Sequence, residues 1–144
     1  MAAEARRPDH WGMTTCLIAD DHEAVLESVS AYLVSEGYDV VGRASTAAEA
    51  IRLLDELRPD VAIVDYRLPD ATGIDIARAR AAAASTTVTL LLSGEATRAV
   101  VVEALAAGVS GVVLKESAPA TLARAIETVL AGKRYIDPML RKKS

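Results

Sequence analysis

Several side chains that can do chemistry stand directly after short apolar runs in this sequence. In chain order these side chains are Asp20 and Asp21, then Asp65, Ser93 and Lys115. Short apolar runs rich in β-branched residues are typical of strands that are buried on both faces of a parallel sheet. Because ligands bind at the carboxyl ends of such strands, these five side chains are candidates for one shared site.

Three carboxylates in one crevice would need compensation. Two carboxylates about 4 Å apart repel by roughly 4 kcal/mol in a protein-like dielectric, so one acid must take up a proton or a cation must enter. Carboxylate oxygens with room for water suit Mg²⁺. Lys115 could pair with Asp65 or with a bound phosphoryl group, and the Ser93 hydroxyl could donate a hydrogen bond to a phosphoryl oxygen.

Each of these residues also has an ordinary structural interpretation. Asp20 and Asp21 could cap the helix that follows them, Ser93 could be a turn residue, and Lys115 could be a solvated strand end. Asp65 could be a loop residue after its strand. Their joint occurrence at the ends of four strands favours a common site over five separate accidents.

The bulk properties indicate one globular domain and give no hint of nucleic-acid binding by the domain as a whole. The chain has 144 residues, of which 51% are apolar, and a net charge of −4. Cys16 has no partner for an internal disulfide, which predicts a reducing, cytoplasmic location. No apolar run is long enough to span a membrane, and the polar N-terminus is not a signal peptide.

Strands and helices are predicted to alternate along the chain. Strands are expected at residues 15–19, 38–41, 61–64, 87–92 and 111–114. Helices are expected at residues 23–36, from a Thr46 cap to Pro59, at residues 74–83 and 96–107, and from a Ser117 cap to Gly132. Ile51, Leu54 and Leu57 are expected to face inward from the second helix.

This alternation predicts an α/β fold with a five-stranded parallel sheet and helices on both faces. The natural arrangement is the flavodoxin-like, doubly wound (βα)5 fold with strand order 2-1-3-4-5. Its crevice lies between the first and third strands, which places Asp20 and Asp21 opposite Asp65. Residues 1–13 are predicted to be a disordered leader, residues 14–132 the domain, and residues 133–144 a linker or tail.

The motifs resemble the receiver domain of two-component response regulators. They are Ala19-Asp20-Asp21-His22, Val64 to Asp70, Thr72-Gly73, Leu92-Ser93-Gly94 and Gly111 to Glu116. The resemblance covers residues 15–132. The Asp-Asp-His start, the Lys115-Glu116 pair and the stretch from Gly132 to Pro138 look like the NarL/FixJ (LuxR-type) subgroup, in which such a linker leads into a helix-turn-helix DNA-binding domain.

The resemblance implies a role for each site residue. Asp65 would accept a phosphoryl group from a sensor histidine kinase, and Mg²⁺ would be held by Asp20, Asp21, Asp65 and the backbone carbonyl of Arg67. Ser93, Gly94 and Lys115 would bind the phosphoryl oxygens. Arg67 and Glu95, each two residues after a site residue, would tune the lifetime of the phosphoryl group. Val112 occupies the switch position, where many receivers have an aromatic ring.

The expected function is therefore a phospho-acceptor that switches a probable transcription factor and is not a turnover enzyme. A homodimer through the first and last helices is one expectation, and the side formed by residues 96–107 and 111–114 stays open as the alternative interface. DNA would be bound only through a further C-terminal domain, which is absent from residues 1–144. Glu23 and Leu26 depart from the Pro and Arg that are common in the subgroup.

Two alternatives stay open on the sequence. One is a receiver-like interaction module that is not phosphorylated. Such modules usually lack an acid or the lysine, and this chain keeps them all. The other is a metal-dependent phosphatase of the haloacid-dehalogenase class, which carries a second Asp two residues after its nucleophile. Here that position holds Arg67, which argues against this class.

Overall fold

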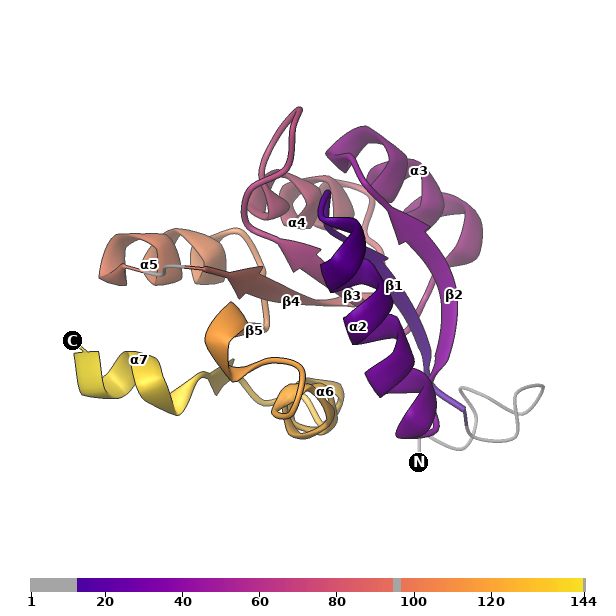
Figure 1. Cartoon of the computed structure of the whole chain (residues 1–144). Coiled ribbons are helices and arrows are strands. Elements are labelled where there is room, and N and C mark those ends of the chain that lie inside the picture. Colours follow the sequence, from indigo (N-terminus) through magenta and orange to yellow (C-terminus); the bar gives the residue numbers. More distant parts are fainter. Residues whose placement is uncertain (1–12, 95–96, 144) are drawn as a thin grey trace.

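The protein folds around a six-stranded parallel sheet with the order β2-β1-β3-β4-β5-β6 (Figure 1). The computed structural model describes residues 13–94 and 97–143. The strands are β1 (Thr15–Ala19), β2 (Asp39–Ala44), β3 (Val61–Asp65), β4 (Val88–Ser93), β5 (Gly111–Leu114) and β6 (Tyr135–Ile136). The doubly wound fold and the order of the first five strands are confirmed.

Helices cover both faces of the sheet and separate two apolar clusters (Figure 1). One face carries α3 (Ala47–Leu57), α4 (Gly73–Ala82) and α5 (Arg98–Ala106), and the other carries α2 (Glu23–Ser35) and α6 (Leu122–Leu130). In the described part of the chain, no helix is long and apolar enough to cross a membrane. A disordered leader was predicted for residues 1–13, and residues 1–12 of it lie outside the described residues.

The central strands form the rigid part that positions the site. Every residue of β1 and β3 is buried, and the two strands are neighbours in register, with Ala19 opposite Val64. Connections leave β1 and β3 towards opposite faces of the sheet, so a crevice opens between their carboxyl ends. The residues that follow Ala19 and Val64 therefore emerge side by side.

The sixth strand was not expected. Tyr135 and Ile136 pair with Gly111 and Val112 of β5, and helix α7 (Pro138–Lys143) follows. Two residues are too few to show a strand pattern in the sequence, which is why residues 133–144 were expected to form a linker or tail. Gly111 permits the pairing, because a Cβ atom there would lie 2.9 Å from the carbonyl oxygen of Tyr135.

The start of the last large helix differs from the sequence expectation. Ser117 does not cap it; Lys115–Ser117 form a 3₁₀ turn, and α6 begins at Leu122. Pro119 explains the difference, because the residue before a proline is disfavoured in the helical conformation, and Ala118 is extended. The Thr121 hydroxyl instead donates a hydrogen bond to the Ser117 carbonyl at 3.2 Å.

Helix α3 also buries a different face from the predicted one. Ile51 and Leu57 are 36% and 40% exposed, so only Leu54 of the three expected residues is buried. Ala47 and Ala50 complete the buried face. Small side chains at these positions let the helix approach the sheet closely, so bulkier residues stay at its margins. The prediction of the inner face relied on the large apolar residues of the helix and was therefore wrong for Ile51 and Leu57.

Gly73 sets the position of Asp65. A Cβ atom on Gly73 would lie 2.5 Å from the Asp65 carbonyl oxygen and 2.7 Å from Leu91 Cδ1. Helix α4 therefore begins pressed against the end of β3. Its start is held by Thr72 and Asp75, whose side chains each accept a hydrogen bond from the other's backbone amide.

Asp70 ties the loop after β3 to the neighbouring helix. Its carboxylate accepts hydrogen bonds from Ala47 N at 2.8 Å and Ala48 N at 2.9 Å, at the start of α3. These two backbone hydrogen bonds lower the pKa of the Asp70 carboxyl. The loop is therefore fixed at both ends, by α4 and by α3.

We predict that Gly73→Ala destabilises the fold by about 3 kcal/mol, at the upper end of typical overpacking costs. The reason is that the new methyl group meets a backbone oxygen, which cannot rotate away. Urea denaturation of the whole chain measures the change. Gly94→Ala is the matched control, since a Cβ atom there meets nothing within 4 Å. Equal stability of the two variants would contradict the packing described.

Candidate functional site

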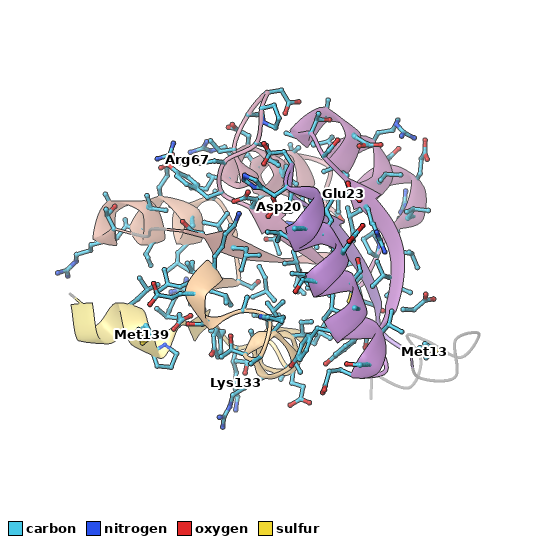
Figure 2. All side chains as sticks on the ribbon, in the orientation of Figure 1. Met13, Asp20, Glu23, Arg67, Lys133 and Met139 are labelled. Atoms are coloured by element: carbon cyan, nitrogen blue, oxygen red, sulfur yellow. The ribbon has the colours of Figure 1, made fainter. Side chains whose placement is uncertain are left out.

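Two buried carboxylates and one ammonium form the centre of the site. Asp20 follows β1 directly, Asp65 is the last residue of β3, and Lys115 follows β5. Lys115 Nζ lies 3.0 Å from Asp65 Oδ2 and 3.1 Å from Asp20 Oδ2. The lysine thus bridges two strands that are not its neighbours. Figure 2 shows Asp20 and Arg67 at the end of the sheet where α2 begins.

Burial strengthens the electrostatic interactions among these charges. Asp20 and Asp65 are 1% and 3% exposed. Burial raises the pKa of Asp65, the hydrogen bond from Lys115 opposes the rise, and the charge of Asp20 adds to it. Desolvation alone would lower the pKa of Lys115, but its hydrogen bond to Asp65 and its ion pair with Asp20 outweigh this and raise it. The ammonium is therefore held charged between the acids.

Asp21 and His22, the two residues that follow Asp20 in the chain, lie at the mouth of this charged centre. His22 Nδ1 is 3.1 Å from Asp20 Oδ1 and 3.3 Å from Asp21 Oδ1. The His22 backbone amide also donates to Asp20 Oδ1 at 2.9 Å. Helix α2 starts after His22 without a side-chain cap, so neither Asp20 nor Asp21 caps it. The two acids are left for the crevice.

The acidic cluster fits a divalent cation. Asp20, Asp21, His22 and Asp65 each offer an atom within 4.8 Å of the others. Asp20 Oδ2 is buried and receives no aligned hydrogen bond from the described residues; only the ion pair with Lys115 compensates it. With all three carboxylates ionised, one ammonium leaves two negative charges, and oxygen ligands of this kind suit Mg²⁺.

Sequence reasoning did not assign His22 to this cluster. It appears in the Asp-Asp-His motif, but nothing in its spacing indicated that its ring would contact both neighbouring carboxylates. The signal available was adjacency alone, since a residue directly after two site acids remains at the same edge of the sheet. Mg²⁺ prefers oxygen ligands, so the ring fits better as a neighbour of the carboxylates than as a ligand.

A cavity of about 300 Å³ lies beside the charged centre. This volume is roughly that of ten water molecules in the liquid, which is ample for a phosphoryl group. Ser93 ends β4 and is paired with Leu114, so it stands next to the strand that carries Lys115. The cavity is lined by His22, Asp65, Tyr66, Arg67, Ser93, Gly94 and Lys115.

The residues predicted to tune or transmit the signal are placed only in part. Arg67 is exposed, and its guanidinium lies 5.4 Å from the centre of the Tyr66 ring. Glu95 lies outside the described residues, so its pairing with Arg67 stays a prediction. Val112 is fully buried in β5, in the apolar cluster on the α5 side.

The chain belongs to the response regulator receiver domain family, whose sequence model matches residues 16–127. It is similar to the DNA-binding transcriptional activator DevR/DosR of Mycobacterium tuberculosis, with 36% identity over 126 residues, or 87% of this chain and 58% of that protein. It is also 34% identical to the probable transcriptional regulatory protein NarL of the same species, over 86% of this chain and 58% of the relative. The chain thus spans about 58% of the length of these relatives.

Solved receiver structures share the fold. A LuxR-family response regulator from Aurantimonas sp. SI85-9A1 superposes with a TM-score of 0.83 at 35% identity, covering 90% of this chain and 94% of that one. The signal receiver domain of the putative response regulator NarL from M. tuberculosis gives 0.80 at 33% identity, covering 84% and 98%. These findings confirm the predicted family and its similarity to NarL- and LuxR-type regulators.

The raised pKa of Asp65 predicts how a neutral substitution changes stability without metal. Ionising Asp65 costs the folded state more than the unfolded chain. This cost is absent below the unfolded pKa of about 3.9, grows as the pH rises towards the folded pKa, and is complete above it. In EDTA, Asp65→Asn should therefore raise the melting temperature at about pH 7, and the gain should vanish near pH 3.5.

Asp70→Asn is the control with the opposite sign. The pKa of Asp70 is lowered, so its stabilisation is present above the unfolded pKa and is lost as the pH falls through the folded pKa. This variant should melt lower than the parent at neutral pH and equally at acidic pH. A parent chain that is more stable than Asp65→Asn at neutral pH would contradict the electrostatics of the site.

Proposed function

We propose that this receiver domain is a Mg²⁺-dependent phospho-acceptor in which Asp65 takes a phosphoryl group from the phosphohistidine of a sensor histidine kinase. The observation that carries the proposal is the Lys115 ammonium, held between buried Asp65 and Asp20 beside an open cavity. In this position the Lys115 ammonium can exchange its ion pair with one carboxylate for an ion pair with a phosphoryl oxygen. The chain acts as a switch and catalyses only its own phosphorylation and dephosphorylation.

The chain's own residues provide positioning and charge. Asp65 Oδ1 accepts a hydrogen bond from Arg67 N at 3.3 Å, which orients the carboxylate that attacks phosphorus. Lys115 then neutralises the transferred phosphoryl group, and the Ser93 hydroxyl and the Gly94 backbone bind its oxygens. Phosphoryl transfer needs little covalent machinery beyond such positioning and electrostatic stabilisation.

The metal ligands proposed are Asp20, Asp21, Asp65 and the Arg67 carbonyl. Mg²⁺ would supply charge neutralisation for the phosphoryl oxygens while they transfer. The buried Asp20 Oδ2, which has no aligned donor among the described residues, supports this assignment. Asp21 is more exposed than the other two acids, so it would form the outer side of the site.

The two alternative functions are less well supported. A phosphatase of the haloacid-dehalogenase class needs an acid two residues after its nucleophile, where this chain has the exposed Arg67. An interaction module without phosphorylation would not need a partly buried lysine held by two buried carboxylates, an arrangement that carries a desolvation cost. Both the family and the retained charges favour the phospho-acceptor.

The output is proposed to be transcriptional. The relatives are named as transcriptional regulators, and this chain spans about 58% of their length, so DNA binding would belong to a further domain. A homodimer through α2 and α6 is proposed as the signalling form. Val112 has no ring to rotate, so activation should change the face around α5 less than in receivers with an aromatic there.

Mg²⁺ should raise the melting temperature of the parent chain and leave that of Asp21→Asn unchanged, because a direct carboxylate ligand is lost. At about ten times its dissociation constant the ion should stabilise the parent by about 1.4 kcal/mol. Thermal denaturation over a Mg²⁺ titration measures this. Asp55→Asn, at an exposed position of α3, is the control and should respond like the parent. An undiminished response in Asp21→Asn would argue against the metal assignment.

Acetyl phosphate with Mg²⁺ should add one phosphoryl group to the parent chain, seen by intact mass and removed by hydroxylamine. Asp65→Asn should abolish the addition because the nucleophile is gone. Lys115→Ala should keep the group longer or separate it from any structural response. Asp70→Asn, on the same loop, serves as the control and should be labelled normally. Full labelling of Asp65→Asn would overturn the nucleophile assignment.

Removing Arg67 or Glu95 should speed loss of the phosphoryl group, if the two side chains together hinder the attacking water. An exposed ion pair is worth only about 0–1 kcal/mol, so stability should barely change. The measurement is the dephosphorylation rate of Arg67→Ala, Glu95→Ala and the double variant. Effects that simply add would show that the residues do not act as a pair.

A further inference from the structure

A buried carboxylate outside the matched receiver region contacts the strand that carries Lys115. Asp137 follows β6, lies beyond residues 16–127, and is 1% exposed. Its Oδ2 accepts a hydrogen bond from Leu114 N at 2.9 Å, and its Oδ1 accepts one from Met139 N at 2.9 Å. One side chain therefore joins the end of β5 to the start of α7.

The hydrogen bond to Leu114 replaces a missing part of the sheet. Asp137 N donates to Val112 O at 2.9 Å, which continues the β5–β6 pairing by one residue. The chain then turns into α7, and the Asp137 carbonyl accepts from Leu140 N at 2.9 Å within that helix. Because the backbone carbonyl is used in this way, the carboxylate satisfies the last buried amide of β5.

Leu114 is the residue directly before Lys115. On its inner side Leu114 is paired with Ser93 of β4, and on its outer side its amide is held by Asp137. The backbone from which the Lys115 side chain starts is therefore fixed from both edges. Its Nζ reaches Asp65 and Asp20 with little freedom left at the base of the side chain.

We propose that Asp137 is a positioning residue for Lys115, through which the phosphoryl site and residues 133–143 influence each other. The inference rests on the proposed function, because it concerns the lysine that binds the phosphoryl group. A ligand that draws Lys115 away from Asp20 displaces the Leu114 amide and changes its bond to Asp137. By thermodynamic linkage, loss of the hydrogen bond between Asp137 and Leu114 N then changes ligand affinity by the same factor by which the ligand changes that bond.

A purely structural role for Asp137 makes a different prediction. As a cap for α7, it would hold Met139 N and support the packing of Leu140 in the apolar cluster. Its loss would then lower stability without a specific effect on the site. Leu140→Ala is the matched control, because it weakens the same helix and leaves the bond between Asp137 and Leu114 in place.

The experiment measures beryllofluoride, a phosphoryl mimic, binding at saturating Mg²⁺ to the whole chain by calorimetry. Loss of one buried hydrogen bond predicts affinity about three- to tenfold weaker in Asp137→Ala. Asp137→Asn should restore part of it, since an amide oxygen still accepts from Leu114 N. Leu140→Ala should bind like the parent. In a Lys115→Ala background, Asp137→Ala should have no further effect.

Each other outcome is decisive. Equal losses in Asp137→Ala and Leu140→Ala, or losses that add in the Lys115→Ala background, would overturn the inference, as would unchanged affinity in Asp137→Ala. A parent chain that fails to bind beryllofluoride would refute the proposed function instead. If Asp137→Ala does not fold, amide hydrogen exchange of the parent decides: beryllofluoride must change exchange at Leu114 and Met139 together, and no change at either overturns the coupling.

Discussion

The structure depends on one ammonium placed between two buried carboxylates. Neighbouring strands bring Asp20 and Asp65 together, and without compensation the repulsion between the two carboxylates would destabilise the fold. Lys115 Nζ lies within 3.1 Å of both. The arrangement is stable but incomplete, because one cation faces three acids. The same imbalance that strains the resting site makes it receptive to a divalent cation and to a group that recruits the lysine.

The rest of the fold keeps these three charges in place. The first and third strands are buried throughout, so Asp20 and Asp65 have rigid backbones. Gly73 presses α4 against the carbonyl of Asp65, and Asp70 holds the intervening loop to α3. On the other side, the end of β5 fixes the base of Lys115. A small change in the position of these charges must therefore move packed elements. In this way a change of charge at the site could alter the surface elsewhere on the domain.

The order of the first five strands and the convergence of Asp20, Asp65 and Lys115 could be predicted from the sequence because both rest on strong local signals. Apolar runs ended directly at Asp65 and Lys115, and parallel topology gathers such ends at one edge. Weaker signals failed. Alanines at Ala47 and Ala50, rather than Ile51, form the inner face of α3, and Pro119 moved the start of α6 away from Ser117. Strand β6 depends on tertiary pairing, which no periodicity reports. The contacts of His22 with Asp20 and Asp21 are local, but periodicity does not report side-chain contacts of this kind either.

The most direct measurement is a crystal structure of the whole chain with Mg²⁺ and beryllofluoride. The account predicts beryllofluoride bonded to an Asp65 carboxylate oxygen, Mg²⁺ coordinated by Asp20 and Asp21, and Lys115 Nζ moved from Asp20 to a fluorine atom. Beryllofluoride bound elsewhere, or bound at Asp65 with Lys115 still paired to Asp20, would contradict the claim that this lysine links the acids to the phosphoryl group.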